Sequence, residues 1–241
     1  MRRSALILAA ALLAALSISF AASGGRAAEK PGLSDALTRT SHLASLHYAV
    51  HVGIREKGMP LALHIRGQSD AHTISVHFQA QGMSGGELVY GPFLYVQAPD
   101  GIAVYGKVRW LRTTLTRLPA NSRELMTLRA LKIGPLLQVV GRGHLNGNGA
   151  GRVFRGPVAY DDPVVRDSLS RLTGGLEFRR LRLTVHLRGG LIDRMRLTGK
   201  TADGSSTLSL TAHLFAFNRP LHVVPPKPGT FMDLELERLS E

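Results

Sequence analysis

The chain of 241 residues contains no cysteine. This absence excludes disulfides, thiol nucleophiles, thiolate metal sites and a lipid attached through cysteine. The P-loop, the dinucleotide-binding fingerprint and the HExxH motif are also missing. Asp193 and Glu177 are isolated carboxylates, so no acidic pair indicates glycoside hydrolysis. The residues therefore predict neither an enzyme nor a cofactor.

Long apolar runs are scarce as well, and the one that stands out is N-terminal. Arg2 and Arg3 precede Leu6–Phe20, which has the length of a signal-peptide core and is short for a membrane span. The small residues around Phe20 predict cleavage after Ala21, and an uncleaved anchor is the alternative. Either way, we expect export to the periplasm, the cell envelope or the exterior. The predicted division is a signal peptide at 1–21, a linker at 22–33, one domain at 34–225 and a C-terminal tail at 226–241.

Acidic residues number 17 against 30 basic ones, which gives a formal net charge of +13. An exported protein rarely meets nucleic acid, so we expect no nucleic-acid partner. One interpretation of the charge is attraction to anionic phospholipid head groups or to an acidic cell envelope. The other is a genome-wide arginine bias, which would spread the charge evenly and mark no site.

Ten histidines raise the question of a metal site. His47, His51, His64, His77 and His186 all fall at positions that the strand pattern assigns to the solvent-facing side. Acidic partners are scarce around them, and exposed histidines need convergent ligands to bind a metal. The sequence therefore predicts no metal site.

Alternation of apolar and polar residues with a period of two predicts two three-stranded antiparallel meanders. The C-terminal meander covers 181–216 and turns at Gly189-Gly190 and Asp203-Gly204. The N-terminal meander covers 46–79 and turns at Lys57-Gly58 and near Asp70. Each meander has one apolar face that other elements must cover.

Helical spacing predicts two amphipathic helices that would cover those faces. The first spans 34–46 after the break at Pro31-Gly32, and the second spans 162–173, with Pro163 at its first position. A short helix is predicted at 122–131. The apolar segment 133–140 precedes a glycine-rich stretch, and we interpret it as a flexible lid or rim beside an apolar cavity, or as a loop that plugs the core.

The remaining segments are less regular. Glu87–Gln97 has apolar residues on both faces, which predicts one strand covered on both sides and bent at Gly91-Pro92. A return strand is predicted at 102–107, and Trp110 is predicted to anchor the core. Phe231–Glu241 is interpreted as a short helix, a strand or a frayed end.

Three motifs give the chain a family resemblance. They are Leu94-Tyr95-Val96 with Trp110-Leu111-Arg112, the strand Val153–Val158 containing Arg155-Gly156, and Phe215–His222. With these motifs the chain resembles the LppX/LprG-type lipoproteins of actinobacteria and, more distantly, the LolA superfamily. The resemblance implies an α+β fold, in which a curved antiparallel half-barrel carries helices across its concave face. It also implies an apolar cavity for the acyl chains of lipids or lipoproteins. The lipobox cysteine of that family is missing here.

These observations together predict a monomeric, non-enzymatic carrier of lipids or lipoproteins, with arginines at the cavity mouth holding an anionic head group. The alternative is a LolA-like protein-binding or sensor domain without a lipid ligand. The candidate cavity residues are Val50, Val52, Leu63, Ile65, Val76, Phe78, Tyr95, Leu183, Val185, Leu210 and Leu214, with Leu136, Leu137 and Val140 at the rim.

Overall fold

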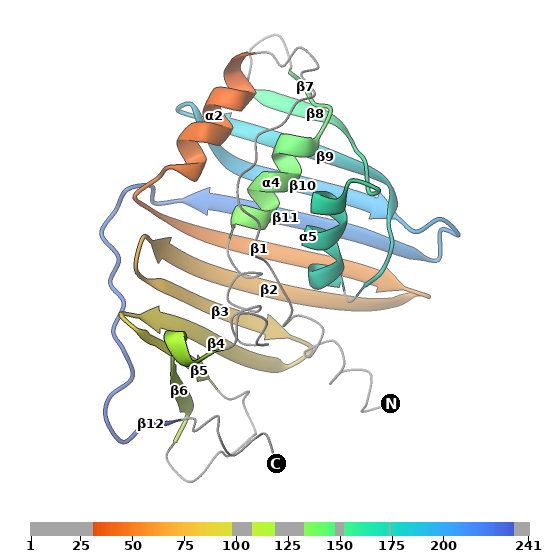
Figure 1. Cartoon of the computed structure of the whole chain (residues 1–241). Coiled ribbons are helices and arrows are strands. Elements are labelled where there is room, and N and C mark those ends of the chain that lie inside the picture. The colour runs from red at the N-terminus through yellow and green to blue at the C-terminus, as the bar shows by residue number, and fades with distance from the viewer. Residues whose placement is uncertain (1–30, 98–107, 119–132, 148–151, 174, 234–241) are drawn as a thin grey trace.

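The computed structural model describes residues 31–97, 108–118, 133–147, 152–173 and 175–233. These residues form a curved, open sheet of twelve strands with three α-helices across one face (Figure 1). We call the face under the helices the inner face and the opposite one the outer face. The predicted α+β half-barrel is confirmed.

The strands are ordered β12-β6-β5-β4-β3-β2-β1-β11-β10-β9-β8-β7 across the sheet. Every neighbouring pair is antiparallel except β12 and β6, which run parallel. Their bounds are β1 (Ser45–Glu56), β2 (Met59–Asp70), β3 (Ile74–Ala80), β4 (Met83–Tyr90), β5 (Phe93–Gln97), β6 (Trp110–Thr114), β7 (Asn146–Gly147), β8 (Val153–Val158), β9 (Arg179–Arg188), β10 (Leu191–Lys200), β11 (Ser206–Phe215) and β12 (Phe231–Asp233).

Both predicted meanders are present, as β1–β3 and β9–β11. They form one sheet because β1 pairs with β11, with His47 opposite Phe215 and Glu56 opposite Ser206. The seam between the two halves of the chain therefore lies in the middle of the sheet. A continuous apolar core results on the inner face, made from alternate residues of strands from both meanders.

The helix α2 (Pro31–Ser41) starts and ends earlier than the predicted range 34–46. Proline at a first helical position loses no hydrogen bond and has a suitable φ, so Pro31 begins the helix where we predicted a break. Ser45 and Leu46 belong to β1 instead. The helix is held on the sheet through Thr40, whose Oγ1 accepts a hydrogen bond from the backbone N–H of Ile192 in β10 at 3.0 Å.

The helix α4 (Gly134–Arg142) corrects the prediction of a flexible segment at 133–140. Gly134-Pro135 looks like a break in the sequence, but proline in the first turn starts a helix. Five of its nine residues are buried, and the helix contacts both α2 and α5 (Pro163–Thr173). The segment is therefore part of the ordered layer that covers the inner face (Figure 1).

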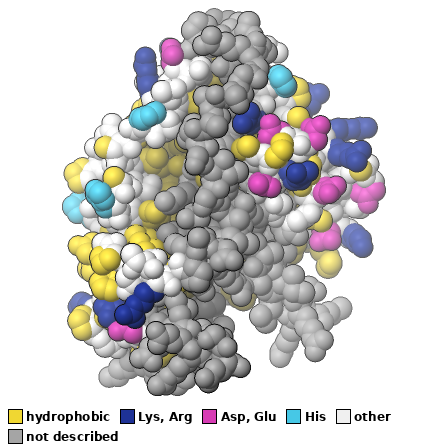
Figure 2. All heavy atoms as spheres, viewed as in Figure 1, with side chains coloured by type: hydrophobic (Ala, Val, Ile, Leu, Met, Phe, Trp, Pro, Cys, Tyr) yellow, Lys and Arg dark blue, Asp and Glu magenta, His cyan; other side chains and the backbone are white. Residues whose placement is uncertain are grey.

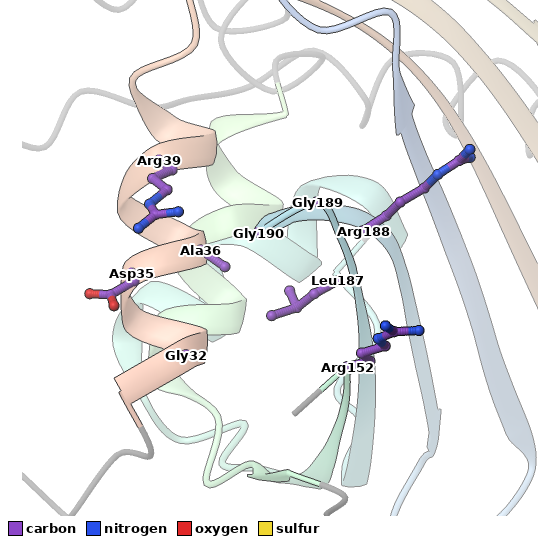
Figure 3. Close-up of a pocket in the computed structure, with 9 residues that line it drawn as sticks. All are labelled: Gly32, Asp35, Ala36, Arg39, Arg152, Leu187, Arg188, Gly189 and Gly190. Atoms are coloured by element: carbon purple, nitrogen blue, oxygen red, sulfur yellow. The ribbon is translucent and has the colours of Figure 1, made fainter. Parts of the chain in front are cut away.

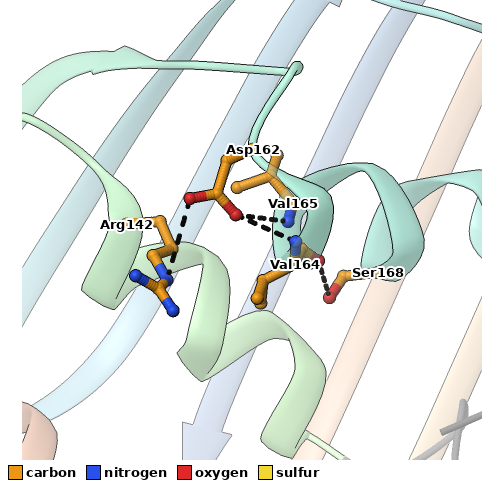
Figure 4. A network of polar contacts seen from close by, with 5 residues as sticks. All are labelled: Arg142, Asp162, Val164, Val165 and Ser168. Atoms are coloured by element: carbon orange, nitrogen blue, oxygen red, sulfur yellow. Dashed lines mark hydrogen bonds and ion pairs between the residues drawn. The ribbon is translucent and has the colours of Figure 1, made fainter. Parts of the chain in front are cut away.

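The start of α5 agrees with the predicted range 162–173, and the structure gives the cap in detail (Figure 4). Asp162 Oδ1 accepts hydrogen bonds from the backbone N–H groups of Val164 at 2.9 Å and Val165 at 3.3 Å. Its second oxygen lies 3.8 Å from Nε of Arg142, at the end of α4. One carboxylate thus satisfies two unpaired donors of α5 and ties the end of α4 to it.

Two further predictions were wrong. Glu87–Gln97 is a hairpin rather than one bent strand, because Gly91 takes a positive φ of 57° and the chain reverses there into β5. Trp110 is half-buried at the start of β6 rather than fully buried in the core. The predicted strand at 102–107 and helix at 122–131 lie outside the described residues, as does the predicted signal peptide. Of the segment Phe231–Glu241, residues 231–233 are described, and they form the strand β12.

The short strand β12 is fastened to β6 by Arg112. Its guanidinium lies 4.7 Å from the ring centre of Phe93 and 4.3 Å from that of Phe231, and its Nε donates to Asp233 Oδ1 at 2.6 Å. The hydrogen bond from Arg112 holds the pKa of Asp233 below its usual range. Trp110, the single tryptophan, is paired with Phe231 in the ladder between β6 and β12. Its fluorescence therefore reports on the contact between these two strands.

We expect acid to release β12. Since the pKa of Asp233 is lowered in the folded state, its stabilisation is complete above the ordinary aspartate pKa of about 3.9 and is lost as the pH falls through the folded-state value. The fluorescence of Trp110 should therefore change in that acid range, and Asp233→Asn should abolish this step.

The control for this titration is Asp203→Asn. Hydrogen bonds from Thr201 and Ser205 lower the pKa of Asp203 to about 2, but this residue lies in the β10–β11 turn. A Trp110 transition that survives Asp233→Asn, or that disappears in Asp203→Asn, would contradict the assignment.

Candidate functional site

The candidate cavity residues lie together on the inner face, with one exception. Twelve of the fourteen are buried members of a single apolar cluster, and Phe78 is partly buried against it. The strand residues among them alternate along β1, β2, β3, β9 and β11, while Leu136, Leu137 and Val140 come from α4. The sequence pattern thus identified one continuous apolar surface.

Tyr95 is the exception and lies on the outer face. Its neighbour Leu94 belongs to the inner cluster, so strand alternation directs Tyr95 to the other side. Its ring is 5.7 Å from that of Phe231, next to the Arg112 contact described above. Tyr95 therefore packs with β12 rather than with the candidate cavity.

Tyr48 and Glu87 are among the polar side chains buried on the inner face, and neither was predicted as a site residue from the sequence. Tyr48 is 1% exposed and Glu87 is 2% exposed. They stand on one line across the sheet, since Tyr48 pairs with Gly67, Gly67 with Val76, and Val76 with Glu87. Burial, and then the charge of Glu87, raise the pKa of Tyr48 above its ordinary value. Glu87 and Val89 are two residues apart on β4 and therefore lie on the same face of the sheet. This spacing is the sequence signal that could have placed Glu87 on the inner face.

Glycine at position 67 makes room for this arrangement. A Cβ atom added there would collide with Cζ and Oη of Tyr48, so the ring lies directly over Gly67. A similar contact occurs two strands away, where a Cβ on Gly85 would meet Phe78 Cζ at 2.6 Å. The inner face beside the helices is thus lined by aromatic rings that lie over glycines.

A cleft opens where α2 meets the β9–β10 hairpin, with a volume of about 630 Å³ (Figure 3). Ala36 from α2 and Leu187 from β9 supply its apolar surface, and Gly189 and Gly190 form the hairpin edge. Leu187 points toward α2 in this view. The volume lies within the range of small-molecule sites, about 300–1,000 Å³.

The rim of the cleft is predominantly basic. Arg39, Arg152 and Arg188 are among its lining residues, together with the acid Asp35, but the side chains of Arg152 and Arg188 point away from α2 (Figure 3). The Arg39 guanidinium lies close to Gly190, since a Cβ there would be 3.1 Å from Arg39 Nη1. Guanidinium groups bind carboxylate and phosphate oxygens through paired donors. The arrangement can therefore hold an anionic group beside an apolar surface.

Arginines at a cavity mouth were predicted from the sequence, but which arginines these are was not. Gly189-Gly190 was recognised as a turn, but its position beside α2 depends on how the helix crosses the sheet. Neither this cleft nor the second pocket, on the outer face, is lined by any of the fourteen candidate residues. The cleft residues are thus an addition to the predicted set.

The five strand histidines point outward, as their parity indicated, and His51 and His64 have ring centres 4.2 Å apart. Within the described ranges, no group of three or more histidine, aspartate or glutamate residues could hold a metal ion. Among the same described residues, no helix is long and apolar enough to cross a bilayer.

No protein-family model and no curated protein matches the chain. Solved structures do match. LprF from Mycobacterium bovis is 14% identical over 81% of this chain and 95% of its own, with a TM-score of 0.44. The lipoprotein LppX from Mycobacterium tuberculosis is 17% identical over 80% and 97%, also with a TM-score of 0.44. A LolA superfamily protein from Nitrosomonas europaea is 10% identical over 81% and 94%, with a TM-score of 0.30.

These structural neighbours belong to the groups that the sequence motifs resemble. TM-scores below 0.5 add no weight to the description of this chain. Its fold follows from the strand order, the pairing register and the three helices on the inner face.

Proposed function

We propose that this protein is an exported, monomeric and non-enzymatic carrier that binds acyl chains of lipids or lipoproteins. It works in the periplasm, in the cell envelope or outside the cell. The observation that carries this proposal is the cleft between α2 and the β9–β10 hairpin, which combines an apolar surface with arginines among its lining residues. An acyl chain enters beside Leu187, and its anionic head group stays near Arg39, the arginine on the α2 side of the cleft (Figure 3).

The inner face supports the same function. Its apolar cluster extends from the helices over strands of both meanders, which offers a chain-binding surface larger than the cleft itself. Binding of an acyl chain there draws on burial, worth about 0.8 kcal/mol per methylene. The thirteen candidate residues other than Tyr95 are the proposed lining once a ligand occupies this face.

The tight packing of the inner face favours the second candidate function. Val185, Val52 and Leu214 are at most 2% exposed, which is the packing of a filled core. A protein-binding or sensor domain without a lipid ligand needs no further space. The two functions differ in a measurable property, namely acyl-chain binding by delipidated protein.

The test is titration of delipidated protein with fluorescent fatty acids of increasing length. Each added methylene is expected to tighten binding up to about fourfold until the site is filled. Leu187→Trp should weaken binding at least about tenfold, because the larger side chain fills the cleft.

The matched control is Val224→Trp, which adds the same side chain at a position that is 80% exposed. This variant should bind as the unmodified protein does. If delipidated protein binds no fatty acid of any length, and native protein carries no lipid into mass spectrometry, the carrier function is wrong and the protein-binding function replaces it.

A further inference from the structure

The outer face of the sheet carries a row of basic, hydroxyl and imidazole side chains that crosses six strands from β8 to β2. Strand pairing places each member directly opposite the next. The members of this first row are Arg155, Thr184, Arg196, Thr211, His51 and His64. Strands are about 4.8 Å apart, so Arg155 and Arg196 stand about 10 Å apart with a threonine between them.

A second row runs parallel to the first, two residues further along each strand. Its members, by the same register, are His186, Arg194, His213, Arg66 and His77. At the β1 position of this row, between His213 of β11 and Arg66 of β2, stands Ala49. All the arginines of both rows are exposed. Together the rows cover seven strands, a width of about 29 Å.

Acidic residues are absent from both rows. The nearest acid along these strands is Asp193, which is half-buried at the irregularity in the β9–β10 pairing. The ion pairs found within the described residues are Arg112–Asp233 and Arg142–Asp162, so neither involves an arginine of the rows. The outer face therefore presents arginine charges that no carboxylate of the rows neutralises.

The two rows enclose a shallow pocket of about 440 Å³ at the β8–β11 end. Arg155, Arg194, Arg196 and His186 line it, and Ser209 and the two threonines of the first row contribute hydroxyl groups. Guanidinium groups donate paired hydrogen bonds to phosphate oxygens, and hydroxyls add single ones. This donor set is the one that phosphate groups require.

The charge is unevenly distributed over the molecule. On the helix side, acidic and basic side chains lie intermingled around the position of α5 (Figure 2). Asp161, Asp162 and Asp167 accompany Arg166 in that segment. An even spread from a compositional arginine bias would not leave the two rows free of acids and another region mixed. The distribution favours a role for the outer face itself.

We propose that the outer face, through the two rows, docks the protein onto a membrane surface rich in anionic phospholipids. The rows form a broad sheet surface suited to a flat array of phosphates. They contain no tyrosine, tryptophan or phenylalanine on which the bases of a single-stranded nucleic acid could stack. The choice of a lipid surface over another polyanion rests on the proposed carrier function, because a carrier must reach the membrane that supplies or receives its lipid.

The experiment measures binding of the full chain to large unilamellar vesicles of phosphatidylglycerol and phosphatidylcholine by co-sedimentation. Binding should occur with phosphatidylglycerol, should be absent with phosphatidylcholine alone and should weaken as salt is raised. The triple variant Arg155→Gln, Arg194→Gln, Arg196→Gln should bind about a hundredfold more weakly, since each arginine near an anionic surface contributes about fivefold.

The matched control removes three positive charges elsewhere, as Arg117→Gln, Arg166→Gln, Lys227→Gln, all exposed and outside the rows. It should keep most of the affinity. Equal losses in the two triples, or no loss in the first, would overturn the proposal. So would binding of duplex DNA through the row arginines without binding of vesicles.

Fatty-acid uptake separates this proposal from the carrier function. The row triple should take up fluorescent fatty acid as the unmodified protein does, because its arginines lie on the face opposite the cleft. Intact uptake with lost vesicle binding supports docking by the outer face. If the row triple binds vesicles as the unmodified protein does, docking by the outer face is refuted and the carrier function is unaffected. If the unmodified protein takes up no fatty acid, the carrier function alone is refuted.

Discussion

Val185→Asp is expected to destabilise the protein by about 4 kcal/mol or more, enough to unfold most of a marginally stable domain. Val185 is completely buried on the inner face of β9. Its partners across the sheet are Met195 and Phe154, both of which are buried and apolar. A carboxylate there loses its hydration and gains no ion pair or hydrogen bond in return. Urea titration followed by circular dichroism measures the loss.

The matched control is the next residue, His186→Asp. His186 is half-buried on the outer face and pairs with Arg194, so the new carboxylate keeps contact with water and meets a positive charge. The change in unfolding free energy should stay within about 0.5 kcal/mol. Val76→Asp and His77→Asp repeat the comparison on β3. Similar losses for both members of a pair would show that the assignment of the two faces is wrong.

Gly67→Val is expected to destabilise the protein by about 1–3 kcal/mol through overpacking. The Tyr48 ring occupies the space that the new side chain needs, and that ring is fully enclosed. It must move from its place near Glu87, against closely packed neighbours. Chemical denaturation measures the loss, and Gly67→Val should cost less in a chain that already carries Tyr48→Ala, because the obstruction is then absent.

Gly53→Val serves as the control on the neighbouring strand. The nearest atom outside its own strand to a Cβ at Gly53 is the carbonyl oxygen of Ser209 at 3.6 Å, an ordinary van der Waals contact on the outer face. The substitution should change stability by no more than about 0.5 kcal/mol. Equal effects at the two glycines would mean that the Tyr48 ring does not lie over Gly67.

The period of two predicted most of this sheet correctly because burial on one face leaves a direct trace in the sequence. Val50 and His51 differ in exposure as their alternation requires, and so do Val185 and His186. The same rule failed at Leu88 and Tyr95, where both faces are covered and alternation carries no information about which side is inner.

Local chemistry explains the predictions that failed elsewhere. Gly134-Pro135 and Pro31 were interpreted as breaks, but proline can begin a helix as well as end one. Which of the two occurs depends on whether another part of the chain offers an apolar surface on which the helix can pack. The pairing of β1 with β11, the cleft at Gly190 and the line from Tyr48 to Glu87 all depend on contacts between distant segments. No local pattern encodes such contacts.

The seam between β1 and β11 has a consequence for how the chain is made. β2 follows β1 immediately during synthesis, but the other edge of β1 has no partner until the ribosome has reached Phe215. Until then β1 presents an open edge beside an uncovered apolar face, which is a template for pairing with other chains. Closing so long a loop also makes folding slow. The strand β11, made long after β1, is thus the element that closes the open edge of β1 and completes the sheet.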